Sequence, residues 1–270
     1  MSDLKRQQTS LVRHDFGAWA TLAKTHPAGT TLPRHQHRAG QLVFALSGVM
    51  LVETVSARWT IPPQRALWVP PLQPHAIHVI SATNMRTVYC QPALVTQCRS
   101  FARRDEVHAV VTSPLIRELV LGLFDERLDL PTRQLMVSLL LQTLQQTPGL
   151  ATHLPMPGSE GLRKAAALLL QTHHWQLPMH HLADVAGMSE RSFTRRFTAE
   201  AGLSFRTWRQ RARIISSLGL LASGASVKAV AQTLQFENAA AYTASFRAVL
   251  GDTPNAFRQA RHVAPSSTPE

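Results

Sequence analysis

One helical unit occurs twice in the last third of the chain, and this repeat constrains the fold more than any other feature. Residues 180–208 match residues 227–257 with an offset of 48 or 49 positions. Small, aromatic and glycine positions recur in both copies: Leu182 pairs with Val230, Ala183 with Ala231, Phe193 with Tyr242, Phe197 with Phe246 and Gly202 with Gly251. The two aromatic positions of each copy lie four apart, on one face of a helix. The sequence therefore predicts two copies of one helical unit, joined by a long helix.

Each copy has the pattern of two helices joined by a tight turn. In the first copy Ala183 is the small residue where two helices can cross, and Gly187 can take the positive φ that such a turn requires. Ser189 has the chemistry of an N-cap for the second helix. The outward side of that helix presents Arg191, Thr194 and Arg195. A helix-turn-helix unit offers a recognition helix to the major groove of DNA in this way.

The charge of the chain favours a polyanionic partner. There are 28 Lys and Arg against 16 Asp and Glu, a formal net charge of +12. The excess is densest between residues 191 and 213, where one acid, Glu200, stands among Arg191, Arg195, Arg196, Arg206, Arg209, Arg211 and Arg213. Guanidinium groups form bidentate contacts with phosphate and guanine. A helix face that is merely solvated is the alternative explanation of such a run.

The stretches LADVAGMSERSFTRRFTAEAGLSFRTW and SVKAVAQTLQFENAAAYTASFRAVLGDTPNAFR carry a specific motif, from AGMS through RRF to GLS, with a second copy that ends in G-x-TP-x-x-FR. They resemble the DNA-binding domain of AraC/XylS-type transcription regulators. The resemblance implies two recognition helices that enter successive major grooves on one face of double-stranded promoter or operator DNA. By motif position it implies that Arg191, Thr194 and Arg195 contact bases. The residues it implies in DNA binding as a whole are Arg191, Thr194, Arg195, Arg196, Arg206, Arg209, Ala240, Thr243 and Arg247.

The second copy departs from the family pattern. Gln235 stands before Phe236 where the family usually has glycine, and residues 239–244 are rich in alanine where polar or basic residues are usual. Alanine can touch a thymine methyl group but cannot hydrogen-bond a base edge. We expect the first helix to read most of the sequence and the second to contribute shape, methyl contacts and phosphate anchoring. Gln235 in a left-handed turn would cost roughly 1 kcal/mol relative to glycine.

The N-terminal part has the pattern of a β domain. Residues 16–95 contain short apolar runs separated by Pro and Gly, and Pro62-Pro63 and Pro70-Pro71 must lie at strand ends or edges. This predicts a small antiparallel barrel or sandwich. After Ser113-Pro114 the apolar period changes to three and four residues, which predicts two helices that end at Pro131 and at Pro148-Gly149. These helices either cap the core of the barrel or form a dimer surface.

The His35-x-His37 spacing, with His75 downstream, resembles the cupin barrel. The predicted fold class is therefore a two-domain chain: an N-terminal all-β cupin-like barrel with a helical pair, and a C-terminal all-α domain with two helix-turn-helix units. The predicted segments are a cupin-like effector-binding domain (1–112), a helical dimerisation or connector segment (113–151), a linker (152–161), the DNA-binding domain (162–262) and a disordered tail (263–270). We expect the first ten residues to be disordered as well.

The stretch HQHRAGQ, from His35 to Gln41, resembles the His-x-His motif of the cupin barrel. By that resemblance His35, His37 and His75 match three metal-ligand positions, Gln41 replaces the usual acid, and Leu72 replaces a turn glycine. Three readings stay open: a divalent metal site formed by these three histidines and Gln41, a pocket for an organic ligand, or packing alone. Imidazole ligands suit Fe, Ni, Cu and Zn. The candidate effector-pocket residues are His35, His37, Gln41, Phe44, Trp68 and His75.

These features predict a transcriptional regulator controlled by a small-molecule effector in the cupin pocket, and not an enzyme. Glu53 is the only acid in the strand region beyond Asp15, so a general acid or base beside a substrate is hard to supply. The expected partners are operator DNA, the effector, a second copy of the chain and, for an activator, RNA polymerase. The alternatives are a metal-dependent cupin enzyme fused to a DNA anchor and a constitutive DNA-binding dimer without an effector.

The remaining sequence features favour a cytoplasmic protein. Cys90 and Cys98 are the only cysteines and do not form a CxxC pair, which predicts reduced thiols. No apolar run approaches the ~18 residues that span a bilayer, and the N-terminus lacks an apolar signal segment.

Overall fold

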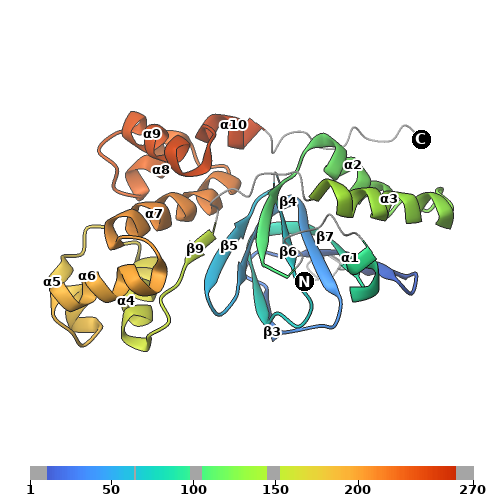
Figure 1. Cartoon of the computed structure of the whole chain (residues 1–270). Coiled ribbons are helices and arrows are strands. Elements are labelled where there is room, and N and C mark those ends of the chain that lie inside the picture. Colours follow the sequence, from blue (N-terminus) through green and yellow to red (C-terminus); the bar gives the residue numbers. More distant parts are fainter. Residues whose placement is uncertain (1–10, 64, 98–104, 145–152, 260–270) are drawn as a thin grey trace, which may run out of the picture. The chain divides into compact units, whose positions relative to one another are not determined.

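The structure is a computed structural model that describes residues 11–63, 65–97, 105–144 and 153–259 (Figure 1). It divides into two compact units, and each is described by itself. The first comprises Met1–Val52 and Ile61–Leu150, and the second comprises Glu53–Thr60 and Ala151–Glu270. The predicted tail 263–270, the first ten residues, Pro148-Gly149 and Cys98 lie outside the described residues.

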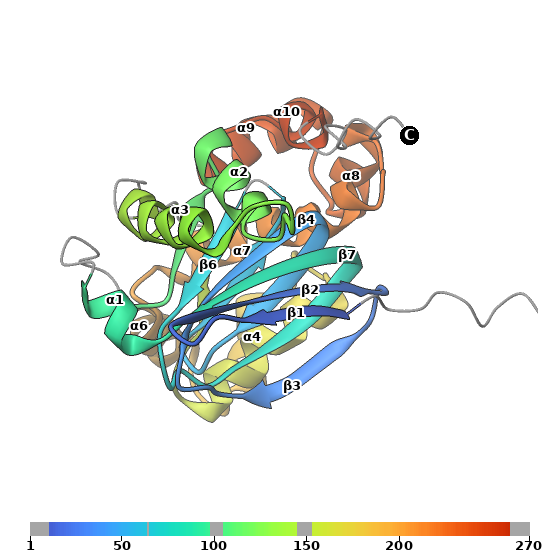
Figure 2. The ribbon, with the colours of Figure 1, turned by 90° about the vertical axis from the view of Figure 1, so that its right-hand side faces the viewer.

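The first unit is built on an antiparallel sheet, as the strand pattern predicts. Its strands are β1 (Leu11–Asp15), β2 (Trp19–His26), β3 (Thr31–His35), β4 (Gly40–Glu53), β6 (Arg65–Val69), β7 (His75–Cys90) and β8 (His108–Val111). The order runs β1-β2-β7-β4 (Figure 2). In addition, β3 pairs with β7, β6 with β4, and β8 with β6. Among the described strands no pairing closes this sheet into a barrel.

Three helices accompany this sheet: α1 (Pro92–Gln97), α2 (Pro114–Gly122) and α3 (Leu130–Thr143). The Ser113 and Asp129 side chains cap α2 and α3, and a proline occupies the first turn of each. Their buried side chains share one core cluster with Phe44 and Trp68. The two helices therefore cap the sheet, while Leu135 of α3 stays 73% exposed.

The end of α2 differs from the sequence expectation. The helix ends at Gly122 and does not run to Pro131. Asp125 accepts hydrogen bonds from the backbone and side chain of Arg127, which fixes a local turn in place of another helical turn. The end predicted for α3, at Pro148-Gly149, lies beyond the described residues.

The second unit contains β5 (Ala57–Ile61) and β9 (His153–Pro155), which pair antiparallel. Part of the predicted linker is therefore a strand. The backbone N–H of Met156 donates to the carbonyl of Ser56, at 2.8 Å, and the indole N–H of Trp208 donates to the carbonyl of Pro155, at 2.6 Å. A short segment from the first part of the sequence, residues 53–60, is thus held to the helical domain through β9.

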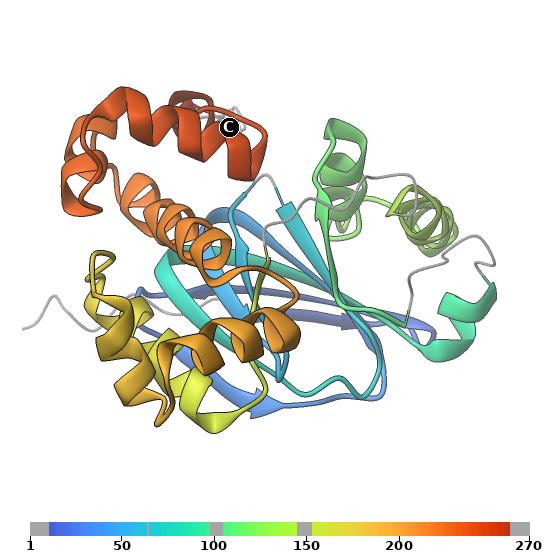
Figure 3. The ribbon, with the colours of Figure 1, turned by 60° about the vertical axis from the view of Figure 1, so that its left-hand side comes forward.

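The helical part of the second unit confirms the repeat. Its helices are α4 (Glu160–Thr172), α5 (Met179–Val185), α6 (Glu190–Ala201), α7 (Phe205–Ala222), α8 (Val227–Thr233), α9 (Ala239–Leu250) and α10 (Pro254–Gln259). The long helix α7 runs between α4–α6 at one end and α8–α10 at the other (Figure 3). The paired aromatics, Phe193 with Phe197 and Tyr242 with Phe246, are buried in its core.

No helix in the described ranges combines the length and apolar character that a membrane crossing requires.

Candidate DNA interface and histidine cluster

The turn of the first helix-turn-helix unit, between α5 and α6, has the geometry that its sequence predicts. Gly187 has φ +67°, and a Cβ there would meet no atom within 4 Å, so the position needs glycine for its backbone angle. The N–H of Met188 donates to the carbonyl of Ala183, at 3.0 Å, which closes α5. Ser189 Oγ then accepts from the N–H of Ser192 and starts α6. The turn therefore fixes where α6 begins.

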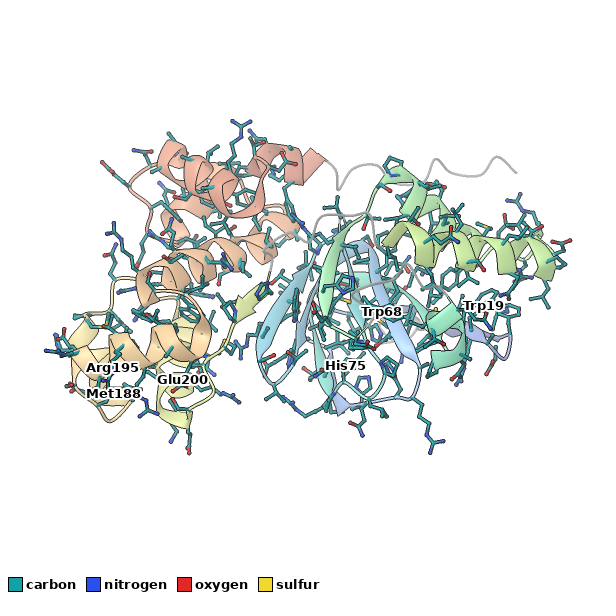
Figure 4. All side chains as sticks on the ribbon, viewed as in Figure 1. Trp19, Trp68, His75, Met188, Arg195 and Glu200 are labelled. Atoms are coloured by element: carbon teal, nitrogen blue, oxygen red, sulfur yellow. The ribbon has the colours of Figure 1, made fainter. Side chains whose placement is uncertain are left out.

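Helix α6 separates a buried face from an exposed one. Phe193 and Phe197 are fully buried, whereas Arg191, Thr194 and Arg195 are exposed. Figure 4 labels Arg195 on this helix. Within the part of the chain that the structure describes, neither Arg191 nor Arg195 has an ion-pair partner, so both guanidinium groups remain available for DNA. Arg196 instead lies 3.4 Å from Glu200, one turn later.

Arg206 and Arg209 of α7 differ in what they contact. Arg209 donates to the carbonyls of Trp175 and Leu177, at 3.2 and 3.1 Å, and its guanidinium lies 4.8 Å from the ring centre of Phe205. Burial lowers its pKa. Arg206 is exposed. Of the two candidates for DNA contacts, Arg209 is held by the protein's own backbone, whereas Arg206 makes no such hydrogen bond to the residues that the structure describes.

The turn of the second helix-turn-helix unit, between α8 and α9, has the backbone strain that its sequence predicts. Gln235, at the position equivalent to Gly187, has φ +60°. The N–H of Phe236 donates to the carbonyl of Ala231, at 2.8 Å, in the same pattern as the first turn. Arg213 of α7 donates from Nε to the carbonyl of Leu234, at 2.6 Å. A side chain from the long helix therefore supports the turn that lacks glycine.

Helix α9 presents an apolar, shallow surface in place of a row of donors. Asn238 caps the helix by accepting from the N–H of Ala241, at 2.8 Å. The surface is lined by Ala239, Ala240, Thr243, Ala244, Arg247 and Ala248. The Thr243 hydroxyl donates to the carbonyl of Ala239, and Arg247 is exposed. Arg247 is therefore the one lining residue with a guanidinium, and the alanines can supply only apolar contacts.

In the first unit the structure brings together three histidines from different elements. His35 ends β3, His37 follows it in the chain, and His75 begins β7, where it is paired in register with His35. The ring centres lie 4.4 Å apart for His35 and His75, 5.3 Å for His37 and His75, and 6.1 Å for His35 and His37. Leu72, with φ +60°, donates its N–H to the carbonyl of His37 and so ties the two loops together. One ring nitrogen of each histidine lies within 4.8 Å of the others.

Gln41 joins this cluster from β4. Its Oε1 lies 2.9 Å from His37 Nε2, and its Nε2 donates to the hydroxyl of Tyr89, at 3.3 Å. His75 is fully buried, and burial lowers its pKa to about 4. Burial also raises the pKa of Tyr89, which keeps its hydroxyl protonated near neutral pH. Tyr89 was not among the residues expected from the sequence, because its place beside Gln41 depends on strand pairing across 48 positions.

Phe44 and Trp68 lie on the other face of the sheet. Leu42 pairs with Trp68, and Phe44 with Ala66, so all four side chains share the face that α2 and α3 cover. Gln41 is three residues from Phe44, and successive strand residues alternate between faces. The structure therefore places Phe44 and Trp68 in the helix-covered core and not beside the histidines.

A cavity of about 540 Å³ opens beside His37 in the first unit. Its remaining walls come from β1, β2, β7 and the loop before β4, and include Arg13, Trp19, Leu22, Arg38 and Tyr89. The cavity combines aromatic and aliphatic surface with the guanidinium groups of Arg13 and Arg38 and the carboxylate of Asp15, which lies 4.0 Å from Arg13. Such a mixture of apolar walls and a few polar groups is typical of small-molecule sites.

Comparisons with known proteins cover both units. The model of an AraC-like ligand binding domain matches residues 21–177, and that of a helix-turn-helix domain matches residues 182–260. The HTH-type transcriptional regulator NimR of Escherichia coli (strain K12) is 33% identical over 249 residues, which cover 91% of this chain and 89% of that protein. The HTH-type transcriptional regulator RipA of Corynebacterium glutamicum is 31% identical over 103 residues, covering 38% of this chain and 31% of that protein.

Solved structures are similar as well. The DNA-binding domain of AdpA, solved in complex with a target DNA, is 35% identical and covers 38% of this chain and 93% of its own, with a TM-score of 0.35. ToxT from Vibrio cholerae O395 is 11% identical and covers 92% of this chain and 99% of its own, with a TM-score of 0.40.

Proposed function

This chain belongs to the AraC family of transcriptional regulators, with an N-terminal ligand-binding domain and a C-terminal helix-turn-helix domain, and we propose that its two recognition helices share sequence reading unequally. It is a DNA-binding regulator and not an enzyme. Helix α6 reads base edges through Arg191, Thr194 and Arg195, and α9 adds apolar contacts and a phosphate anchor at Arg247. The observation that carries this division is the contrast between Arg191 and Arg195 of α6, which form no ion pair with any described residue, and the alanine-lined surface of α9.

Selection of binding sites from a random DNA library tests the division. Arg195→Ala should relax base preference at the positions that α6 contacts, by roughly 1–3 kcal/mol per lost bidentate contact. Ala240→Ser, on α9, should leave the selected sequence nearly unchanged. Equal effects of the two substitutions would contradict the proposal. The two half-sites should lie about one helical turn of DNA apart, because the units bind successive grooves.

The effector is a small organic molecule that enters the cavity beside His37. The apolar wall formed by Ala20, Leu22 and the ring of Tyr89 suits a hydrocarbon or ring, and Arg38, which is exposed, suits an acidic or strongly polar group. Binding can regulate DNA affinity only if the effector prefers one conformation of the chain over another. Compounds that raise the melting temperature of the full chain should lose that effect in Arg38→Ala. Arg34→Ala, a nearby exposed arginine outside the lining, is the matched control.

A homodimer formed through α3 accounts for the exposed leucines of that helix. Leu135 and Leu139, one turn apart, are 73% and 42% exposed on the side away from the core. A second copy can cover the same stripe by two-fold symmetry. Sedimentation should show a dimer that Leu135→Glu dissociates. The chain would act in the cytoplasm, where promoter DNA is reached, and as an activator it would also contact RNA polymerase.

A further inference from the structure

We propose that His35, His37, His75 and Gln41 bind one divalent transition-metal ion through the three Nε2 atoms and the amide oxygen of Gln41. Metal binding does not depend on the proposed function. Only its effect on DNA binding rests on the N-terminal domain acting as the ligand-binding module of a regulator.

The first argument is the protonation that the backbone imposes on each ring. His35 Nδ1 lies 2.7 Å from the carbonyl of Pro33, His37 Nδ1 lies 2.6 Å from that of Ala39, and His75 Nδ1 lies 2.8 Å from that of Gln73. A carbonyl oxygen only accepts hydrogen bonds, so each Nδ1 carries the proton in the neutral ring. Each Nε2 is then left with its lone pair. Metal-binding histidines typically have their second nitrogen held by a backbone carbonyl in this way.

The second argument is a pairing that hydrogen bonds alone leave unsatisfied. His37 Nε2 and Gln41 Oε1 lie 2.9 Å apart, and with the proton of His37 on Nδ1 both atoms are acceptors. The Gln41 amide is oriented by its donation to the Tyr89 hydroxyl. A cation that binds both atoms removes the conflict, because two neighbouring ligands about 2.1 Å from one ion lie roughly 3 Å apart.

The third argument is the buried nitrogen of His75. Among the described residues, no group hydrogen-bonds to His75 Nε2, although the side chain is fully buried. A buried lone pair without a partner is costly. A metal ion satisfies it together with the lone pairs of His35 and His37.

Distance and ligand chemistry limit which metal ions can bind at this site. One nitrogen from each ring lies within 4.8 Å of the others, and ligands of one ion at about 2.1 Å are separated by no more than about 4.2 Å. Because only a trans pair reaches that limit and other ligand pairs lie about 3.0–3.6 Å apart, the rings need to close by about 1 Å. Three imidazoles suit Fe²⁺, Co²⁺, Ni²⁺, Cu²⁺ and Zn²⁺ and not Ca²⁺ or Mg²⁺. Four neutral ligands leave the full charge of the ion in place.

The experiment titrates Co²⁺ and Zn²⁺ separately into the untagged, chelator-treated full chain. Co²⁺ is followed by its visible absorption and Zn²⁺ by calorimetry. We expect one site that Ca²⁺ does not occupy. Loss of one ligand in His35→Ala or His37→Ala should weaken that site by more than about 100-fold, because even second-shell changes cost 10- to 100-fold. Gln41→Glu should tighten it, since a carboxylate adds opposite charge.

His78→Ala is the matched control, because His78 lies three residues from His75 on the same strand and hydrogen-bonds to Thr31. It should leave the site unchanged. Equal weakening in His78→Ala and His35→Ala would assign the signal to surface histidines and overturn the proposal. Absence of a stoichiometric site would also overturn it, and would mean that the Gln41 amide is turned over and donates to His37 Nε2.

The same samples separate this proposal from the proposed function. If the chain binds specific DNA but shows no metal site, the proposed function stands and the metal proposal is wrong. If His35→Ala abolishes a metal site but the chain selects no DNA sequence, the metal proposal stands and the proposed division of DNA reading is wrong.

Discussion

The guanidinium of Arg213 lies 3.7 Å from the ring centre of Phe236. The same side chain donates to the carbonyl of Leu234, the residue just before the strained Gln235. Arg213 therefore holds both sides of the turn in the second helix-turn-helix unit. Arg209, one turn earlier on α7, donates instead to the carbonyls of Trp175 and Leu177, in the segment between α4 and α5.

Relief of the strain at Gln235 should stabilise the helical domain. Gln235→Gly is expected to raise the free energy of unfolding by up to about 1 kcal/mol, because glycine adopts φ +60° without penalty. Gly187→Ala, at the equivalent position of the first unit, should lower it by a similar amount, since no atom obstructs the added Cβ and only the backbone angle is strained. Urea unfolding of both variants measures the difference. A change of the same sign in both would contradict this account.

Removal of the Arg213 side chain should lower the stability of the second helix-turn-helix unit. Arg213→Ala is expected to cost about 1–3 kcal/mol, from a lost hydrogen bond to a buried carbonyl and a lost contact with an aromatic face. A double-mutant cycle with Phe236→Ala should give a coupling energy of at least about 0.5 kcal/mol. Additive effects in the unfolding free energy would show that the two side chains do not interact.

Arg206 and Arg209 should separate DNA binding from stability. Arg206→Ala should reduce the slope of log affinity against log salt by about one and leave the unfolding free energy unchanged, as expected for an exposed phosphate contact. Arg209→Ala should lower stability, because two backbone carbonyls lose their donor. The measurements are salt-dependent DNA binding and urea unfolding. If Arg209→Ala reduced the salt dependence of DNA affinity and left the unfolding free energy unchanged, Arg209 would be a DNA contact and this prediction would be wrong.

Glu200 should make part of the stability depend on pH. The N–H of Ser159 donates to its Oε2, at 2.7 Å, and this bond, with Arg196 nearby, lowers the pKa of Glu200. A lowered folded pKa gives stabilisation that is complete above the unfolded value, about 4.3, and is lost as the pH falls through the folded pKa. Glu200→Gln should therefore be less stable than wild type at pH 7 and equal to it in acid.

The control for this pH dependence is Glu237→Gln, at an exposed glutamate in the second turn. Urea midpoints at neutral and acidic pH compare the three proteins. If the difference between Glu200→Gln and wild type were the same at both pH values, the Ser159 contact would not depend on ionisation.

The helix-turn-helix units were predictable because their signals are local. Gly187, Ser189 and the spacing of Phe193 and Phe197 each act within one or two turns of helix, and the structure confirms all of them. The histidine cluster was predictable in part, because a family resemblance brought His75 together with His35 and His37. Its position beside Tyr89 depends on strand register, which no short stretch of sequence specifies.

Two other placements illustrate different limits of sequence reasoning. Phe44 could have been assigned to the opposite face from Gln41 by alternation alone, since the two are three residues apart on one strand. Arg209 could not have been separated from Arg206 in this way, because a guanidinium that caps backbone carbonyls has the same sequence appearance as one that binds phosphate. The difference lies in which carbonyls α7 passes, and that is a property of the packed domain.

The strand β9 also bears on how this protein can be divided for experiment. A DNA-binding fragment that begins at Glu160, where α4 starts, would leave the indole of Trp208 without Pro155 as its acceptor. A fragment that begins before His153 would keep that bond but lack residues 53–60, which contain most of β5, the strand with which β9 pairs. No single cut in the polypeptide yields the second unit intact. A chimera that replaces the N-terminal domain with another would have to include residues 53–60 together with the DNA-binding domain.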